Sequence, residues 1–85
     1  LRGIVMAQVD QDEFVPAIEA LRQIPEVIEC VGISGRDDLM CQVGARDPDH
    51  LYLVSQRMMR CPGIRRTATS LVLREFVSHR TDQLL

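Results

Sequence analysis

The pattern of apolar and polar positions predicts strands in some segments of the chain and helices in others, and the first segment has the composition of a strand. Residues 1–9, Leu-Arg-Gly-Ile-Val-Met-Ala-Gln-Val, are rich in apolar and β-branched side chains. Within this segment, the run from Ile4 to Ala7 has no polar position on either face. Because a strand that is apolar on both faces is covered on both sides in a folded protein, the sequence predicts a central strand here.

Two later segments have the period of a helix. The first lies between Asp10 and Pro25, with Pro16 in its first turn, where a missing N–H does least harm. The second is predicted to begin with Asp47 as N-cap and Pro48 at the first helical position. Each carries one apolar stripe at helical spacing, formed by Phe14, Ala17, Ile18 and Leu21 in the first helix and by Leu51, Val54 and Met58 in the second.

A hairpin is predicted between the two helices. Residues 27–34 and 39–46 have the apolar content of strands, and the stretch Ser-Gly-Arg-Asp-Asp at 34–38 joins them. Glycine adopts positive φ angles freely, and Asp side chains bond to nearby backbone, so this stretch is typical of a tight turn.

Period-two alternation also predicts which side chains share a face of the sheet. Within 27–34, it places Val27 on the same face as Glu29 and puts Cys30 on the other face. A last strand is predicted over 65–77, in which Thr67, Thr69, Leu71 and Leu73 alternate with Ala68, Ser70 and Val72.

The predicted order of elements is therefore βαββαβ. Right-handed crossovers bring its two halves into one four-stranded antiparallel sheet with both helices on one face, which is the ferredoxin-like α+β arrangement. The other face of the sheet stays partly apolar and uncovered, so it must meet another surface. The pattern predicts a homodimer that pairs through its sheets, as in dimeric α/β-barrels.

Length and charge narrow the possible partners. We expect one domain over 1–78 and a tail over 79–85, and a chain this short buries only roughly 60–65% of its extended surface, so it gains from association. Hydrophobic residues make up 46% of it, which argues against disorder. No apolar run approaches the ~20 residues of a membrane helix. The net charge of −2 argues against direct contact with nucleic acid.

The cysteines and histidines give no sign of a metal or cofactor site. Cys30 and Cys41 are expected to be buried in strands, and only Cys61 is expected to be reachable. An odd number of cysteines without CxxC spacing is typical of a reduced, cytosolic protein. His50 is expected to be exposed, and it is far from His79 in the sequence, so no metal site and no cofactor are predicted.

A series of short motifs marks the ends of the predicted elements: Pro25-Glu26-Val27, Gly35-Arg36-Asp37-Asp38, Asp47, Pro62-Gly63-Ile64, Thr67-Ala68-Thr69 and Leu71-Val72-Leu73. None is specific alone, but their order and spacing together are. With them, the chain resembles the effector-binding and assembly (RAM) domain of the Lrp/AsnC, or feast/famine, transcriptional regulators, over roughly Ile4 to Val77.

The resemblance implies that dimers form through the sheets and associate into tetramers or octamers. It also implies that an amino acid or related small molecule binds between dimers, near the hairpin turn. In this family, DNA contact belongs to a helix-turn-helix domain that is absent from this sequence, so we expect an isolated domain or a stand-alone version. The implied effector-binding positions are Gly35, Arg36, Asp37 and Asp38 in the turn and Thr67, Thr69 and Ser70 in the last strand.

Five of these seven positions have a second interpretation. Asp37 stands where the family has an aromatic residue, so it either favours a cationic ligand or marks a domain that serves only assembly. Asp37 and Asp38 either hold an ammonium group or stabilise the turn. Arg36 contacts a ligand carboxylate or remains a solvated or intersubunit charge. Thr67 and Thr69 bond to the ligand or simply suit a strand.

Two other functions are compatible with the fold. Small dimeric α/β-barrel monooxygenases and isomerases share the architecture, and Glu29 is the one candidate catalytic group at an inward strand position. Adjacent carboxylates on a surface turn lack the dry pocket that acid–base catalysis needs, so we expect no enzyme activity. The third possibility is an assembly domain that binds no ligand.

Overall fold

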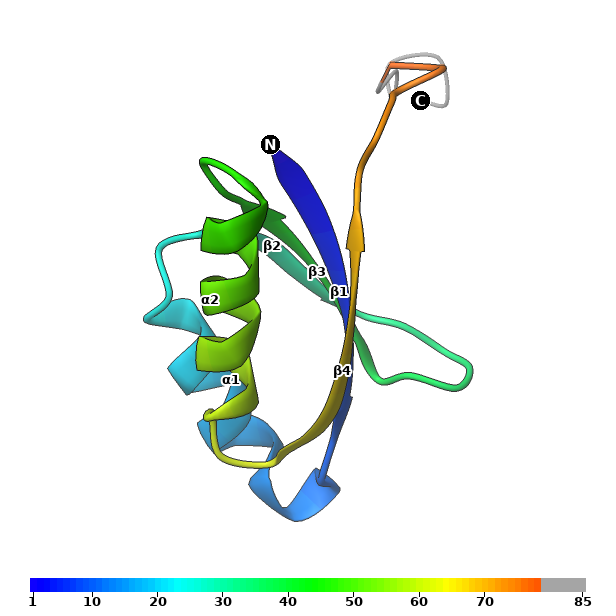
Figure 1. Cartoon of the computed structure of the whole chain (residues 1–85). Coiled ribbons are helices and arrows are strands. Elements are labelled where there is room, and N and C mark those ends of the chain that lie inside the picture. The colour runs from blue at the N-terminus through cyan, green and yellow to red at the C-terminus, as the bar shows by residue number, and fades with distance from the viewer. Residues whose placement is uncertain (79–85) are drawn as a thin grey trace.

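The helices and strands follow one another in the predicted order. The computed structural model of the chain describes residues 1–78, and the predicted tail, 79–85, lies outside the described residues. The elements are β1 (Arg2–Val9), the short 3₁₀ helix η1 (Gln11–Glu13), α1 (Phe14–Arg22), β2 (Val27–Gly32), β3 (Leu39–Gly44), α2 (Pro48–Met59) and β4 (Ile64–Leu71) (Figure 1).

One antiparallel sheet carries all four strands, in the order β2-β3-β1-β4. Both helices lie on the same side of it (Figure 1), which confirms the ferredoxin-like α+β arrangement. The N-cap of α2 is also confirmed, because the Asp47 carboxylate accepts the His50 N–H at 2.7 Å. The core lies between sheet and helices and consists of Val5, Ala7, Val9, Ala17, Leu21, Ile24, Leu39, Cys41, Val43, Leu51, Val54 and Met58.

Among the described residues, no helix lies on the second face of the sheet (Figure 1). Met6 of β1 lies beside Met40 of β3 and Ala68 of β4, and Met40 in turn lies beside Val31 of β2. Since paired residues share a face, these four side chains form one line across all four strands. We call Val31, Met40, Met6 and Ala68 the apolar row. Val31 is 37% exposed and Ala68 is also exposed, so the described part of the chain leaves this row uncovered.

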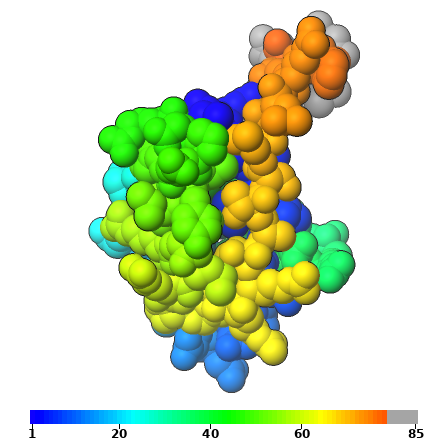
Figure 2. All heavy atoms as spheres, viewed as in Figure 1, coloured from blue at the N-terminus to red at the C-terminus, as the bar shows by residue number. Residues whose placement is uncertain are grey.

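The last strand is shorter than predicted. It ends at Leu71 rather than at 77 because its neighbour β1 runs out. Gly3 pairs with Leu71, and one further backbone bond follows, from the Val72 N–H to the Arg2 carbonyl at 2.9 Å. Residues 72–78 then project beyond the end of the sheet (Figures 1 and 2).

The expected faces of β2 were wrong at one point, because the strand contains a bulge. Val27 pairs with Val43, but Glu29 already pairs with Gln42, so Ile28 is an extra residue. Val27 therefore lies on the helix-covered face, whereas Glu29 lies on the open face. The bulge fits beside Gly44, where an added Cβ would lie 3.2 Å from Ile28 Cδ1.

Candidate functional site

The hairpin turn is attached to the end of β1 through Asp38. One carboxylate oxygen of Asp38, Oδ2, accepts the Val9 N–H at 2.8 Å, and the Asp38 N–H donates to the Ala7 carbonyl at 2.9 Å. The Asp38 carbonyl also accepts the Ile33 N–H at 3.0 Å, which closes the hairpin. Asp38 thus joins the turn to two other segments, the end of β1 and the residue after β2. Val9, whose N–H it binds, is buried.

The tip of the turn stands clear of the helices (Figures 1 and 2). Gly35 has a φ of +119°, a conformation that side-chain-bearing residues rarely adopt. Arg36 is exposed, and its carbonyl accepts a weak bond from Gln8 Nε2 at 3.4 Å. Asp37 is half-buried. The tip therefore offers a guanidinium and a carboxylate to a neighbouring molecule.

The strand β4 candidates do not all gather at the turn. Thr67 pairs with Ala7, the residue that accepts the Asp38 N–H, so Thr67 is level with the turn. Thr69 pairs with Val5, on the helix-covered face and further along the strand. Ser70 pairs with Ile4, on the open face. Of these three residues, only Thr67 lies close to the end of β1, to which the turn is bonded.

Sequence reasoning missed two polar residues beside the turn, Gln8 and Arg66. They pair across β1 and β4 on the open face, next to the apolar row, and Gln8 reaches the turn through the Arg36 carbonyl. The sequence held a sign of this pair, because Gln8 is the first polar residue after the apolar run of β1. Arg66 is its partner in β4. The turn end of the open face thus carries the polar pair Gln8 and Arg66, beside the charged turn residues Arg36 and Asp37.

A groove of about 610 Å³ lies between α1 and the edge strand β2. It is lined mainly by apolar side chains, among them Phe14, Ile18 and Ile28, and it also includes Cys30. The expectation that only Cys61 is reachable was therefore wrong: Cys30 is half-buried like Cys61, because β2 is an edge strand, whereas Cys41 is fully buried.

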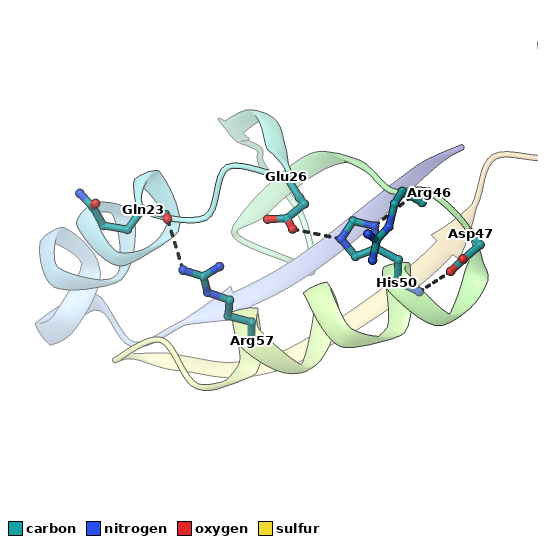
Figure 3. A network of polar contacts seen from close by, with 6 residues as sticks. All are labelled: Gln23, Glu26, Arg46, Asp47, His50 and Arg57. Carbon is teal, nitrogen blue, oxygen red and sulfur yellow. Dashed lines mark hydrogen bonds and ion pairs between the residues drawn. The ribbon is translucent and has the colours of Figure 1, made fainter.

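His50 is not exposed, contrary to the prediction from its place in the first turn of α2. Its Nδ1 accepts the Arg46 N–H at 2.9 Å, so Nε2 carries the proton and donates to Glu26 Oε2 at 3.0 Å (Figure 3). The imidazole is held by the loop before β2 and the loop after β3, and this long-range packing left no trace in the local sequence.

The same contact affects the acidity of Glu26. The hydrogen bond from His50 is the main cause that holds the pKa of the Glu26 carboxyl below its usual range. The second oxygen, Oε1, is buried and has no hydrogen-bond partner among the described residues. Glu26 therefore depends on His50 for its main contact.

Within residues 1–78, no group of three or more His, Cys, Asp or Glu side chains is arranged to hold a metal ion. In the same part of the chain, no helix is long and apolar enough to cross a membrane.

Comparison with known sequences gives one family and one curated relative. A family model described as the Lrp/AsnC ligand binding domain matches residues 2–82. Homocitrate synthase from Sulfurisphaera tokodaii is 29% identical over 76 residues, which are 88% of this chain and 16% of that enzyme. The chain thus spans a small part of this relative.

Comparison with solved structures gives the same fold in proteins of different length. TTHA0845 from Thermus thermophilus is 26% identical and has a TM-score of 0.79, covering 91% of this chain and 98% of that one. The transcriptional regulator NMB0573 from Neisseria meningitidis, solved as its complex with L-Met, is 21% identical with a TM-score of 0.84. That match covers 100% of this chain and 59% of the regulator.

The Asp38 contact can be tested by removing the acceptor. Asp38→Ala leaves the buried Val9 N–H without a partner, and we expect a loss of about 1–3 kcal/mol in the free energy of unfolding, measured by urea denaturation. Asp38→Asn keeps an acceptor oxygen and should lose less. Asp37→Ala is the matched control and should stay near wild type. Equal losses in Asp37→Ala and Asp38→Ala would contradict this role.

The Glu26–His50 contact should appear in the pH dependence of stability. Because the pKa of Glu26 is lowered in the folded state, its contribution to stability is present above the unfolded value of about 4.5 and is lost as the pH falls through the folded value. Urea denaturation between neutral pH and pH ~2 should therefore show a shallower acid decline in Glu26→Gln than in wild type. The exposed Glu19→Gln should keep the wild-type slope, and parallel curves for wild type and Glu26→Gln would refute the contact.

Proposed function

This chain belongs to the Lrp/AsnC ligand-binding domain family, and from that premise we propose that residues 1–78 are the amino-acid-sensing and oligomerisation domain of a regulatory protein. The observation that carries the proposal is the uncovered apolar row on the open face of the sheet. A monomer would leave this line of side chains in water, whereas two copies packed face to face bury it.

Further apolar side chains favour the same association. Leu73 and Phe76, in the segment that projects beyond β4, are 88% and 86% exposed. The described residues of one chain leave both in solvent, and a second chain beside the sheet would shield them. We propose that such dimers associate further into tetramers or octamers, as the family resemblance implies.

The effector in this proposal is a small zwitterion held between dimers at the hairpin turn. An amino acid carries one ammonium and one carboxylate group, and the turn end of the open face offers charges of both signs. Asp37 would accept the ammonium group, and Arg66 or Arg36 would bind the carboxylate through its planar guanidinium. The L-Met complex of the Neisseria regulator supports this class of ligand.

Gly35, Asp38 and Thr67 would form the frame of this site, since the turn needs the backbone of Gly35 and the anchor at Asp38. Thr69 and Ser70 are placed along the sheet away from the turn, so they would reach the effector only from a neighbouring chain. An effector bound between dimers stabilises the assembly that holds it by its difference in affinity for the two states.

The proposed role is regulatory rather than catalytic. Glu29, the one catalytic candidate, lies on the open face and accepts a bond from Gln42 Nε2 at 3.3 Å. A second setting for the same role is an enzyme rather than a DNA-binding protein. The likeness to a segment that makes up 16% of a homocitrate synthase favours it, and there the effector would control turnover.

The proposal is tested by titrating the purified chain with each of the twenty amino acids, first by thermal shift and then by calorimetry. We expect at least one amino acid to raise the melting temperature, because binding to the folded state stabilises it by mass action. Arg66→Ala should weaken that binding about tenfold or more, since a charge-assisted bond contributes about 1.5–3 kcal/mol.

Arg65→Ala, at the neighbouring position, is the matched control. Arg65 is already paired with Asp10 at 3.4 Å, so its removal should leave the affinity for the amino acid unchanged. Light scattering with and without the bound amino acid shows whether assembly responds. A chain that binds none of the twenty, or a double variant with Arg36→Ala and Arg66→Ala that binds like wild type, would overturn the proposed site.

A further inference from the structure

Two cysteines face each other across the hairpin. Cys30 of β2 pairs directly with Cys41 of β3, on the helix-covered side of the sheet. The Cys41 thiol donates to the Cys30 sulfur, and the two Sγ atoms lie 3.2 Å apart. The third cysteine, Cys61, lies in the turn after α2 and takes no part in this contact.

The backbone geometry of this pair suits a covalent bond. Gly44 directs its N–H toward β2, to the Glu26 carbonyl, and Ala45 directs its N–H toward β1, to the Leu1 carbonyl. Because amide directions alternate along a strand, Cys41 directs its N–H toward β1. Cys30 and Cys41 therefore form a non-hydrogen-bonded pair, for which Cα atoms lie about 4.5 Å apart, within the range of about 4.4–6.8 Å that disulfides span.

The two thiols differ in access and acidity. Cys30 is half-buried on the open groove beside α1, whereas Cys41 is fully buried behind it. The hydrogen bond from Cys41 lowers the pKa of Cys30 to about 7, against the opposing effect of burial. The same bond, together with burial, raises the pKa of Cys41. Since the thiolate is the nucleophile, the reachable cysteine is also the reactive one.

We propose that Cys30 and Cys41 are a peroxide-sensitive dithiol that closes to an intramolecular disulfide and so links β2 covalently to β3. This modification site is independent of the proposed effector site, which lies at the turn end of the open face.

The reaction has two steps. The Cys30 thiolate attacks one oxygen of hydrogen peroxide, the O–O bond breaks, and Cys30 becomes a sulfenic acid while the released hydroxide takes a proton to form water. The Cys41 sulfur then attacks the Cys30 sulfur, and the S–S bond forms as the second hydroxide leaves with the Cys41 proton as water. Two thiols are oxidised by two electrons in total, and one peroxide is reduced to two waters.

Oxidation of Cys30 also prepares Cys41 for the second step. The bond to the Cys30 sulfur is the main cause of the raised pKa of Cys41. Oxidation replaces the Cys30 thiolate with a neutral sulfenic acid, which is a weaker acceptor for the Cys41 proton. The disulfide would then hold the edge strand β2, which lines the groove, covalently to β3. Oxidation would thus make the β2–β3 hairpin, which carries the turn, more rigid.

The test treats the reduced, full chain with hydrogen peroxide, blocks the remaining thiols with an alkylating agent, and maps the peptides by mass spectrometry. We expect a bond between Cys30 and Cys41, one alkylated thiol at Cys61, and complete reversal by dithiothreitol. Because burial raises the pKa of Cys61, the pair should react about tenfold faster than Cys61 near neutral pH.

Cys61→Ser is the matched control and should form the same bond at the same rate, whereas Cys30→Ser should form none. The peptide map of the unaltered chain decides the question even where a variant fails to fold. A bond to Cys61, oxidation of Cys61 before the pair, or peroxide treatment that leaves both Cys30 and Cys41 as free thiols would overturn the proposal.

Discussion

The structure depends on an apolar row that lies on the face of the sheet left uncovered by the two helices of the described residues. Both helices cover the same face, and the core lies beneath them. On the other face, the apolar row of Val31, Met40, Met6 and Ala68 crosses every strand without a cover from the described residues. The exposure of apolar surface to water is unfavourable in proportion to its area, so this row favours association with another surface.

The candidate effector site is tied to this face through shared strands. Asp38 attaches the turn to the end of β1, and β1 also carries Met6 at the centre of the apolar row. The next pair on the open face after Met6 and Ala68 is Gln8 and Arg66, so this face changes from apolar to polar toward the turn. In the proposed function, a ligand held at the turn would contact the same strands as a second copy of the chain, and this would link binding to assembly.

Local sequence patterns correctly predicted the features that depend on a few neighbouring residues. The cap at Asp47, the start of α2 at Pro48 and the turn around Gly35 were all predicted, because each depends on a few adjacent residues. The bulge at Ile28 and the bonds of His50 were missed, because each arises where segments distant in the sequence meet. The same reason applies to Cys30 and Cys41, whose contact exists only through strand register.

The central claim is that the open face is an interface between copies of this chain. Sedimentation equilibrium of the purified chain at micromolar concentration tests it most directly, because it gives the mass of the particle without any ligand or label. The account predicts a mass of two chains or a multiple of two. A particle with the mass of one chain throughout that range of concentration would contradict it.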